Sequence, residues 1–329
     1  MSRPLEIQMP AAAKPYAPVV KASTLAPGAK EPALQAVDAP GSAPRVAARA
    51  KAEVAEKLPA RELFLISAKK HSLAALMTFL SIGALVAFWY VATLYKLDFY
   101  VRFNNIPTPG EVFTNMVELM QNQRFQTNIW KSVVRIMQGF AMATALGVTL
   151  GLLCGRFAVV RGLMFPALEV LRPIPAIAWV PISIMLWPTT ESSIIFITFI
   201  GAFFPILINT MAGVKGVDPV LLRAAKSLGA NEFTMLSKVI LPAALPNVFT
   251  GLAVGMGVAW VSLIAAEMIS GQFGVGYFTW EAYSLIEYPN IVLGMIVIGV
   301  LGLLCSGGIL LLARLLMPWQ HIAGPGGGK

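Results

Sequence analysis

Six apolar stretches divide the chain after residue 72, and each is about as long as a helix that crosses a membrane. A helix needs about 20 apolar residues to span the roughly 30 Å of bilayer hydrocarbon. The stretches lie at about 73–95, 133–154, 163–187, 192–211, 243–269 and 291–316. The pattern therefore predicts an all-α membrane protein with about six transmembrane helices.

The third stretch is broken by prolines at positions 173, 175 and 181. Irregular backbone within a membrane is tolerated only where it is buried in protein or lines a cavity. Two interpretations follow: this span borders a translocation path, or it is kinked for packing. We favour the path, with Pro173, Pro175 and Trp179 as candidate lining residues.

The segments outside the spans have a different composition. Residues 1–70 are rich in Ala, Pro, Lys and Arg, which predicts a disordered tail with either no specific role or a regulatory one. It does not read as a secretory signal, because the first apolar run starts near Ser72. We therefore expect a disordered tail over 1–70, a transmembrane domain over 71–318 and a flexible tail over 319–329.

Charge changes the picture in two ways. Only 12% of residues are charged, about half the share of a soluble domain. The net charge of +9 does not indicate nucleic-acid binding, because the basic residues lie in the first 70 residues and in short connections between spans. Basic connections stay in the cytoplasm, so both termini and the connection 214–242 are expected there, with the acidic connection 270–290 outside.

Residue types that carry catalysis are sparse. Cys154 and Cys305 lie inside apolar runs, and His71 and His321 lie at opposite ends of the chain, so neither a metal site nor a catalytic triad is indicated. The phosphate-binding pattern of an ATPase is absent, since the Gly-Lys pair at the end of the chain lacks the following Ser or Thr. We expect no catalytic residue, metal or cofactor on this chain.

Two charged residues within the spans need an explanation. Glu267 lies in the fifth span and Arg135 in the second, and an ionisable group in a membrane span is a functional candidate by default. Either the two pair for structural reasons, or they line the pathway, where Arg135 would attract an anion. Glu191 starts the fourth span, where an acidic residue suits a helix N-terminus. An ion-coupled secondary transporter, the alternative of a different class, would need several such groups.

The connection 214–242 is more than a linker. Asp218 followed by Pro219 predicts a helix start, and Gly229 predicts its end. Between them, apolar residues fall on one helical face, and a second helix is expected from about Asn231 to Leu241-Pro242. The apolar face requires a partner surface, which is either the ends of the chain's own helices or a groove on another protein.

The same connection resembles a known family. Ala224-Ala225, three residues, Gly229, nine residues and Val239-x-Leu241-Pro242 are similar to the "EAA" loop of binding-protein-dependent ABC import permeases. The runs 172–181, 257–268 and 271–278 resemble the nitrate, sulfonate, taurine and bicarbonate branch of that family. The resemblance covers nearly all of 72–318, with one departure: Arg223 stands where the family usually has Glu.

The resemblance implies a type I ABC importer permease in the bacterial inner membrane. Its partners would be a second permease copy, two ATP-binding subunits that carry ATP and magnesium, a periplasmic substrate-binding protein and the lipid bilayer. Its substrate would be a small anion such as taurine, another organic sulfonate or nitrate, with bicarbonate as the alternative. The implied coupling residues are Leu221, Leu222, Arg223, Ala224, Ala225, Leu228, Gly229, Leu241 and Pro242, and our pathway candidates are Arg135, Pro173, Pro175, Trp179 and Glu267.

Overall fold

The computed structural model describes residues 60–96 and 105–319, which are helical apart from short connections. The chain divides into two units, residues 1–77 and 78–329. Of the first unit, the structure describes only the start of helix α2 (Ala60–Leu94). Most of the predicted disordered tail and nearly all of the C-terminal tail therefore lie outside the described residues.

The described residues contain five helices that are long and apolar enough to cross a membrane. They are α2, α4 (Gln123–Arg156), α7 (Thr190–Lys215), α10 (Leu241–Ser270) and α12 (Tyr288–Leu316). A bent helix pair between α4 and α7 brings the number to six if it counts as one span. The predicted all-α membrane fold is confirmed.

The bent pair consists of α5 (Ala158–Leu171) and the continuous stretch of η2 (Ala176–Trp179) and α6 (Val180–Leu186), which meet at 87°. Pro173 and Pro175 lie in the break between them. A proline has no amide N–H to donate and pushes the preceding residue out of helical geometry. The two prolines therefore end α5 and turn the chain before the helix resumes.

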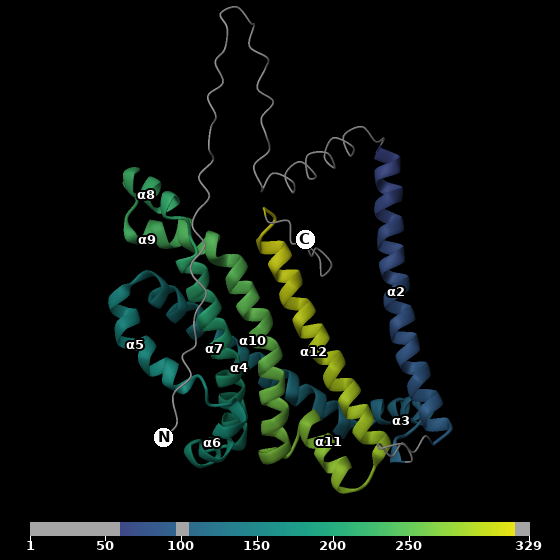
Figure 1. The fold of residues 1–329 in the computed structure, drawn as a ribbon. Coiled ribbons are helices and arrows are strands. Elements are labelled where there is room, and N and C mark those ends of the chain that lie inside the picture. Colours follow the sequence, from purple (N-terminus) through teal and green to yellow (C-terminus); the bar gives the residue numbers. More distant parts are fainter. Residues whose placement is uncertain (1–59, 97–104, 320–329) are drawn as a thin grey trace, which may run out of the picture. The chain divides into compact units, whose positions relative to one another are not determined.

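Helix α7 packs along α4 on one side and along α10 on the other (Figure 1). Glycines of α4 let the first pair approach closely, since a Cβ on any of them would come within 3 Å of an α7 atom. Small residues at helix contacts are how membrane helices bring their backbones together. The α4 glycines are Gly139, Gly147, Gly151 and Gly155, and they face Thr198, Ile206, Thr210 and Val214 of α7.

The same device recurs between α7 and α10. Gly251 and Gly255 of α10 lie against Asn209 and Ile206 of α7, and Gly201 of α7 lies against Ser262 of α10. The buried core follows this contact, with Ile206, Leu207 and Leu263 almost fully enclosed. The three helices therefore form a tightly packed centre.

Short helices lie at the ends of the long ones. Helix α3 (Pro109–Met120) and helix α11 (Val275–Ser284) lie at one end, and α8 (Pro219–Ser227) lies at the other (Figure 1). A capping box starts α3, because Thr108 Oγ1 accepts from the Glu111 amide and Glu111 accepts from the Thr108 amide. Both ends of the central helices are thus covered by structure from the connections.

Three expectations differ from the structure. Residues 60–70, expected as part of the disordered tail, are helical, because α2 begins at Ala60. Helix α4 begins at Gln123 rather than near Val133, because Asn122 caps it and its first turns are polar. A search for apolar residues misses such turns. The connection 270–290, expected as a loop, contains α11, whose mixed aromatic and polar sequence forms no apolar run long enough to signal a helix.

Candidate functional site

Helix α8 starts and ends where the sequence predicts. Asp218 caps it, with Oδ1 accepting from the Val220 amide at 2.7 Å, and Pro219 occupies the first turn. At its end Gly229 has a positive φ of 81°. The Gly229 amide donates to the Lys226 carbonyl at 3.0 Å and the Ala230 amide to the Ala225 carbonyl at 3.1 Å, the two bonds of a Schellman motif.

Helix α8 has two apolar faces with different surroundings. Leu222 and Ala225 face inward and pack on a buried cluster. The cluster is formed by Val214 of α7, Val217 of the following connection, Ala244 of α10, and Met235 and Ile240 of the short helix that precedes α10. Val220, Leu221 and Leu228 are exposed, Leu228 to 87%. The interpretation that α8 packs on the chain's own helix ends is therefore correct for the inward face, and the outward face has no apolar cover among the described residues.

The exposed face continues into the next elements, α9 (Glu232–Thr234) and the π-helix η3 (Met235–Ile240). Phe233 of α9 is 79% exposed. Ala224 and Arg223 are exposed on α8, and Arg223 forms no ion pair within the described ranges. Leu241 and Pro242, which were also predicted as coupling residues, are half-buried in the first turn of α10. They therefore do not belong to the exposed face.

A surface ion pair that the sequence did not reveal anchors α9. Arg156, at the end of α4, donates through Nε and Nη2 to both carboxylate oxygens of Glu232, at 2.8 to 3.1 Å. The two residues are 76 positions apart, and nothing in the spacing of either one signals the pairing. The contact joins the end of α4 to the segment that carries α8.

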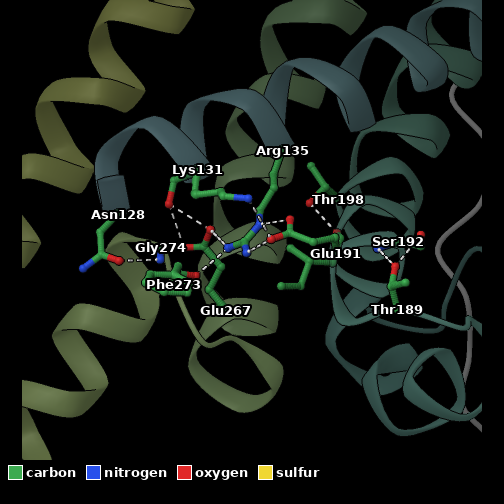
Figure 2. A network of polar contacts seen from close by, with 12 residues as sticks. Asn128, Lys131, Arg135, Thr189, Glu191, Ser192, Thr198, Glu267, Phe273 and Gly274 are labelled. Atoms are coloured by element: carbon green, nitrogen blue, oxygen red, sulfur yellow. Dashed lines mark hydrogen bonds and ion pairs between the residues drawn. The ribbon is translucent and has the colours of Figure 1, made fainter. Parts of the chain in front are cut away.

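A second polar feature lies at the other end of α7 and α10, centred on Arg135 of α4 (Figure 2). Its Nε and Nη2 donate to the two carboxylate oxygens of Glu191 at 2.7 Å each, and its Nη1 donates to Glu267 at 2.8 Å. The same Nη1 donates to the Phe273 carbonyl. One guanidinium therefore joins α4, the start of α7 and the end of α10.

The buried carboxylate of Glu267 is satisfied from several sides. Ser132 Oγ donates to it at 2.8 Å and the Gly276 amide at 3.0 Å, in addition to Arg135. Ser132 in turn accepts from the Val275 amide. The network thus also pins the start of α11, as expected of a buried charge that is retained only with full hydrogen bonding.

Gly274, in the connection between α10 and α11, is required by this arrangement. Its φ is 124°, a backbone conformation that side chains rarely adopt, and its amide donates to Asn128 Oδ1 at 3.0 Å. A Cβ placed on Gly274 would meet the Glu267 carboxylate. Glycine is therefore the residue that lets the connection pass over the ion pair.

The structure brings together two of the five pathway candidates, Arg135 and Glu267, in the pairing that the sequence allowed as their structural explanation. It adds Glu191, whose position at a helix start gave no hint of an ion pair. Two carboxylates face the Arg135 guanidinium, and Lys131 Nζ also pairs with Glu191 at 3.4 Å. The four charges sum to zero, and Arg135 is not free to bind an anion. This favours a structural role for Arg135.

The other three candidates lie at the bend between α5 and α6. Pro175 lines a cavity of about 380 Å³ that neither Arg135 nor Glu267 reaches. Pro173 is exposed, and Trp179 is half-buried with no hydrogen-bond partner for its ring N–H among the described residues. Among those residues, no three His, Cys, Asp or Glu side chains gather as they would around a metal ion.

The sequence of this chain matches a family of transport proteins and several of its members. Residues 147–321, which include α7, α8 and α10, match the family described as "Binding-protein-dependent transport system inner membrane component". The chain is 45% identical over 192 residues to a putative ABC transporter permease of Methanocaldococcus jannaschii, covering 58% of this chain and 72% of that protein.

Two further relatives have more specific descriptions. The chain is 34% identical over 250 residues to the taurine transport system permease protein TauC of Escherichia coli, covering 73% of this chain and 90% of that protein. It is 33% identical over 227 residues to the nitrate import permease protein NrtB of Synechocystis, covering 66% and 82%. The match to each runs through most of the relative's length.

Proposed function

Because the chain belongs to the family of binding-protein-dependent transport system inner membrane components, we propose that α8 is the element through which a separate ATP-binding subunit drives it. The chain is a permease subunit of an ABC importer. Permeases of this family work together with an ATPase and a substrate-binding protein. The exposed apolar face of α8 is the observation that carries the proposal.

The two faces of α8 suit a coupling element. An amphipathic helix that lays an apolar face into a groove is a common mode of recognition between proteins, and Val220, Leu221 and Leu228 supply that face. The inward face rests on η3, which continues into α10, and on Val214 at the end of α7. A push on α8 therefore passes to the helices of the packed centre.

Charge around the site supports the orientation in which α8 lies in the cytoplasm. Lys215, Arg223, Lys226 and Lys238 lie in or beside the α8 segment, whereas the connection between α10 and α12 carries Glu281 and Glu287 and no basic residue. Cytoplasmic connections carry the excess of Lys and Arg. In this orientation both termini are cytoplasmic, and α3 and α11 face the periplasm.

The proposed assembly contains two copies of this chain, two ATP-binding subunits and a periplasmic binding protein. One chain supplies a single α8, so a homodimer presents one such helix to each ATP-binding subunit. Exposed apolar side chains along α10 and α12 provide surface for both lipid and a second copy. ATP and magnesium would be held by the partner subunits.

For the substrate we propose a small anion, with taurine or another organic sulfonate first, nitrate next and bicarbonate as the alternative. The taurine and nitrate permeases to which this chain is similar support this choice. The proton- or ion-coupled alternative is less favoured, because Glu267 is enclosed in a salt bridge rather than placed in a relay of ionisable groups.

The test places a charge on the exposed face of α8. We expect Leu228→Glu and Leu221→Glu to reduce co-purification of the cognate ATP-binding subunit at least tenfold, because a carboxylate would be buried in an apolar groove. Thermal stability of the isolated permease should change little, since both side chains are exposed. Co-purification and ATP hydrolysis by the assembled complex are the measurements.

A matched control is Leu285→Glu, which alters a similarly exposed leucine after α11. This variant should assemble normally. Wild-type amounts of bound ATP-binding subunit in both α8 variants would show that α8 is not the coupling element.

A further inference from the structure

The cavity beside the bend between α5 and α6 differs in character from the ion-pair network. Its volume is about 380 Å³, and three elements enclose it: the bend itself, α7 and α10. Most of its wall is apolar. The lining residues are Arg172, Ile174, Pro175, Ala176, Ile200, Gly201, Phe204, Pro205, Ile208, Asn209, Val254 and Val258.

Arg172 is the charged side chain in this lining, and its surroundings are the opposite of those of Arg135. Its side chain forms no ion pair and no hydrogen bond with any residue in the described ranges, and it is exposed. It follows the 14 residues of α5, about 20 Å along that helix. An unpaired guanidinium within a membrane domain is costly unless it faces water or an anion.

Acceptors line the cavity as well. Asn209 Nδ2 donates to the Pro205 carbonyl at 2.8 Å, which leaves its Oδ1 able to accept. Pro205 lies inside α7 and has no N–H, so the carbonyl of Gly201, four residues earlier, lacks its helical donor. The cavity thus combines one cation, two unused acceptors and an apolar wall.

We propose that this cavity is a binding site for substrate within the translocation pathway, with Arg172 holding the acidic head group. The proposal rests on the proposed function and names the ligand class: a small organic anion with an apolar body and an N–H donor, of which an aminoalkanesulfonate is the model. The guanidinium binds the sulfonate oxygens, Asn209 and the Gly201 carbonyl accept from the amino group, and the apolar wall contacts the methylene groups.

This chemistry distinguishes between the candidate substrates. Nitrate has no donor for the acceptors and no apolar body for the wall, so it uses Arg172 alone. Buried polar groups left unpaired by a ligand count strongly against that ligand. The cavity therefore favours an aminoalkanesulfonate over an inorganic anion.

The experiment uses the complete importer in proteoliposomes and measures ATP-dependent uptake of labelled taurine, with ethanesulfonate and nitrate as competitors. For the wild type we expect taurine to be taken up and ethanesulfonate to compete at least tenfold better than nitrate. Arg172→Gln should reduce taurine uptake at least tenfold, and Arg172→Lys should retain an intermediate rate. Asn209→Leu should weaken taurine uptake and leave competition by ethanesulfonate, which has no amino group, largely unchanged.

The control is Arg161→Gln, which removes an arginine from the other end of α5, outside the cavity lining; it should leave taurine uptake unchanged. Wild-type taurine uptake by both Arg172→Gln and Asn209→Leu would overturn the proposal. So would a wild-type importer in which nitrate competes better than ethanesulfonate. The amount of ATP-binding subunit that co-purifies reports separately on α8, so failure of this proposal is distinguishable from failure of the coupling role.

Discussion

Two of the arginine–glutamate pairs formed by helix α4 have the same closest distance, 2.8 Å, but lie in opposite surroundings. Arg135 and Glu267 have side chains that are 3% and 0% exposed, whereas Arg156 and Glu232 are 29% and 64% exposed. A buried pair whose partner is removed leaves an uncompensated charge, while an exposed pair is already solvated. The two pairs have the same N···O distance, but removing one partner should cost more free energy of unfolding in the buried pair than in the exposed pair.

The comparison extends to the two ends of the packed centre. At the Arg135 end, charges and amide groups are satisfied within the chain, and the connection between α10 and α11 is pinned down. At the Arg156 end, α8 is held by its inward face and presents Leu221 and Leu228 outward. One end is complete in itself, and the other has a surface suited to a partner.

The largest effect is expected when the buried pair is broken. Arg135→Ala leaves Glu267 charged and enclosed, so we expect a loss of about 3–5 kcal/mol in the free energy of unfolding. Reversible unfolding in mixed micelles measures it. The loss should shrink when Glu267→Leu is added, because the second change removes the unpaired charge. A loss below about 1 kcal/mol for Arg135→Ala would contradict this expectation, because it would equal the loss expected for an exposed ion pair.

An intermediate effect is expected at the end of α8. Gly229→Ala puts a side chain at a positive φ, which costs about 1–2 kcal/mol, and the strain should appear as faster amide hydrogen exchange over residues 219–230. Gly162→Ala in α5 is the control, because no atom lies within 4 Å of its added Cβ and its φ is ordinary. Unchanged exchange in Gly229→Ala would mean that the Schellman turn does not hold the helix.

The smallest effect is expected from the exposed pair. Arg156→Ala should change the free energy of unfolding by about 0–1 kcal/mol, and by less at high salt, because solvent and ions already screen the charges. The same unfolding assay, run at two salt concentrations, measures it. A loss as large as that of Arg135→Ala would remove the distinction between the two ends.

Much of the fold could be predicted from local sequence. Long apolar runs indicate the spans, Pro173 and Pro175 indicate the break, and Asp218-Pro219 with Gly229 marks both ends of α8. These signals act within a few residues, so a single sequence contains them. Helix α11 has no such signal, since aromatic and polar residues alternate through it without an apolar run.

The candidate site could be predicted only in part, for a physical reason. Arg135 pairs with residues 56 and 132 positions away, and only the packing of α4 against α7 and α10 brings them together. Which face of α8 points inward depends in the same way on where the ends of those helices lie.

The glycine contacts between α4, α7 and α10 have a mechanical consequence. With backbones nearly touching at Gly147, Gly151 and Gly255, there is no layer of flexible side chains that would absorb a shift between neighbouring helices, and close-packed interiors compress little. The three helices are therefore expected to move as one rigid body. A displacement of α8 by about an ångström would reach the opposite ends of α4, α7 and α10 with little loss.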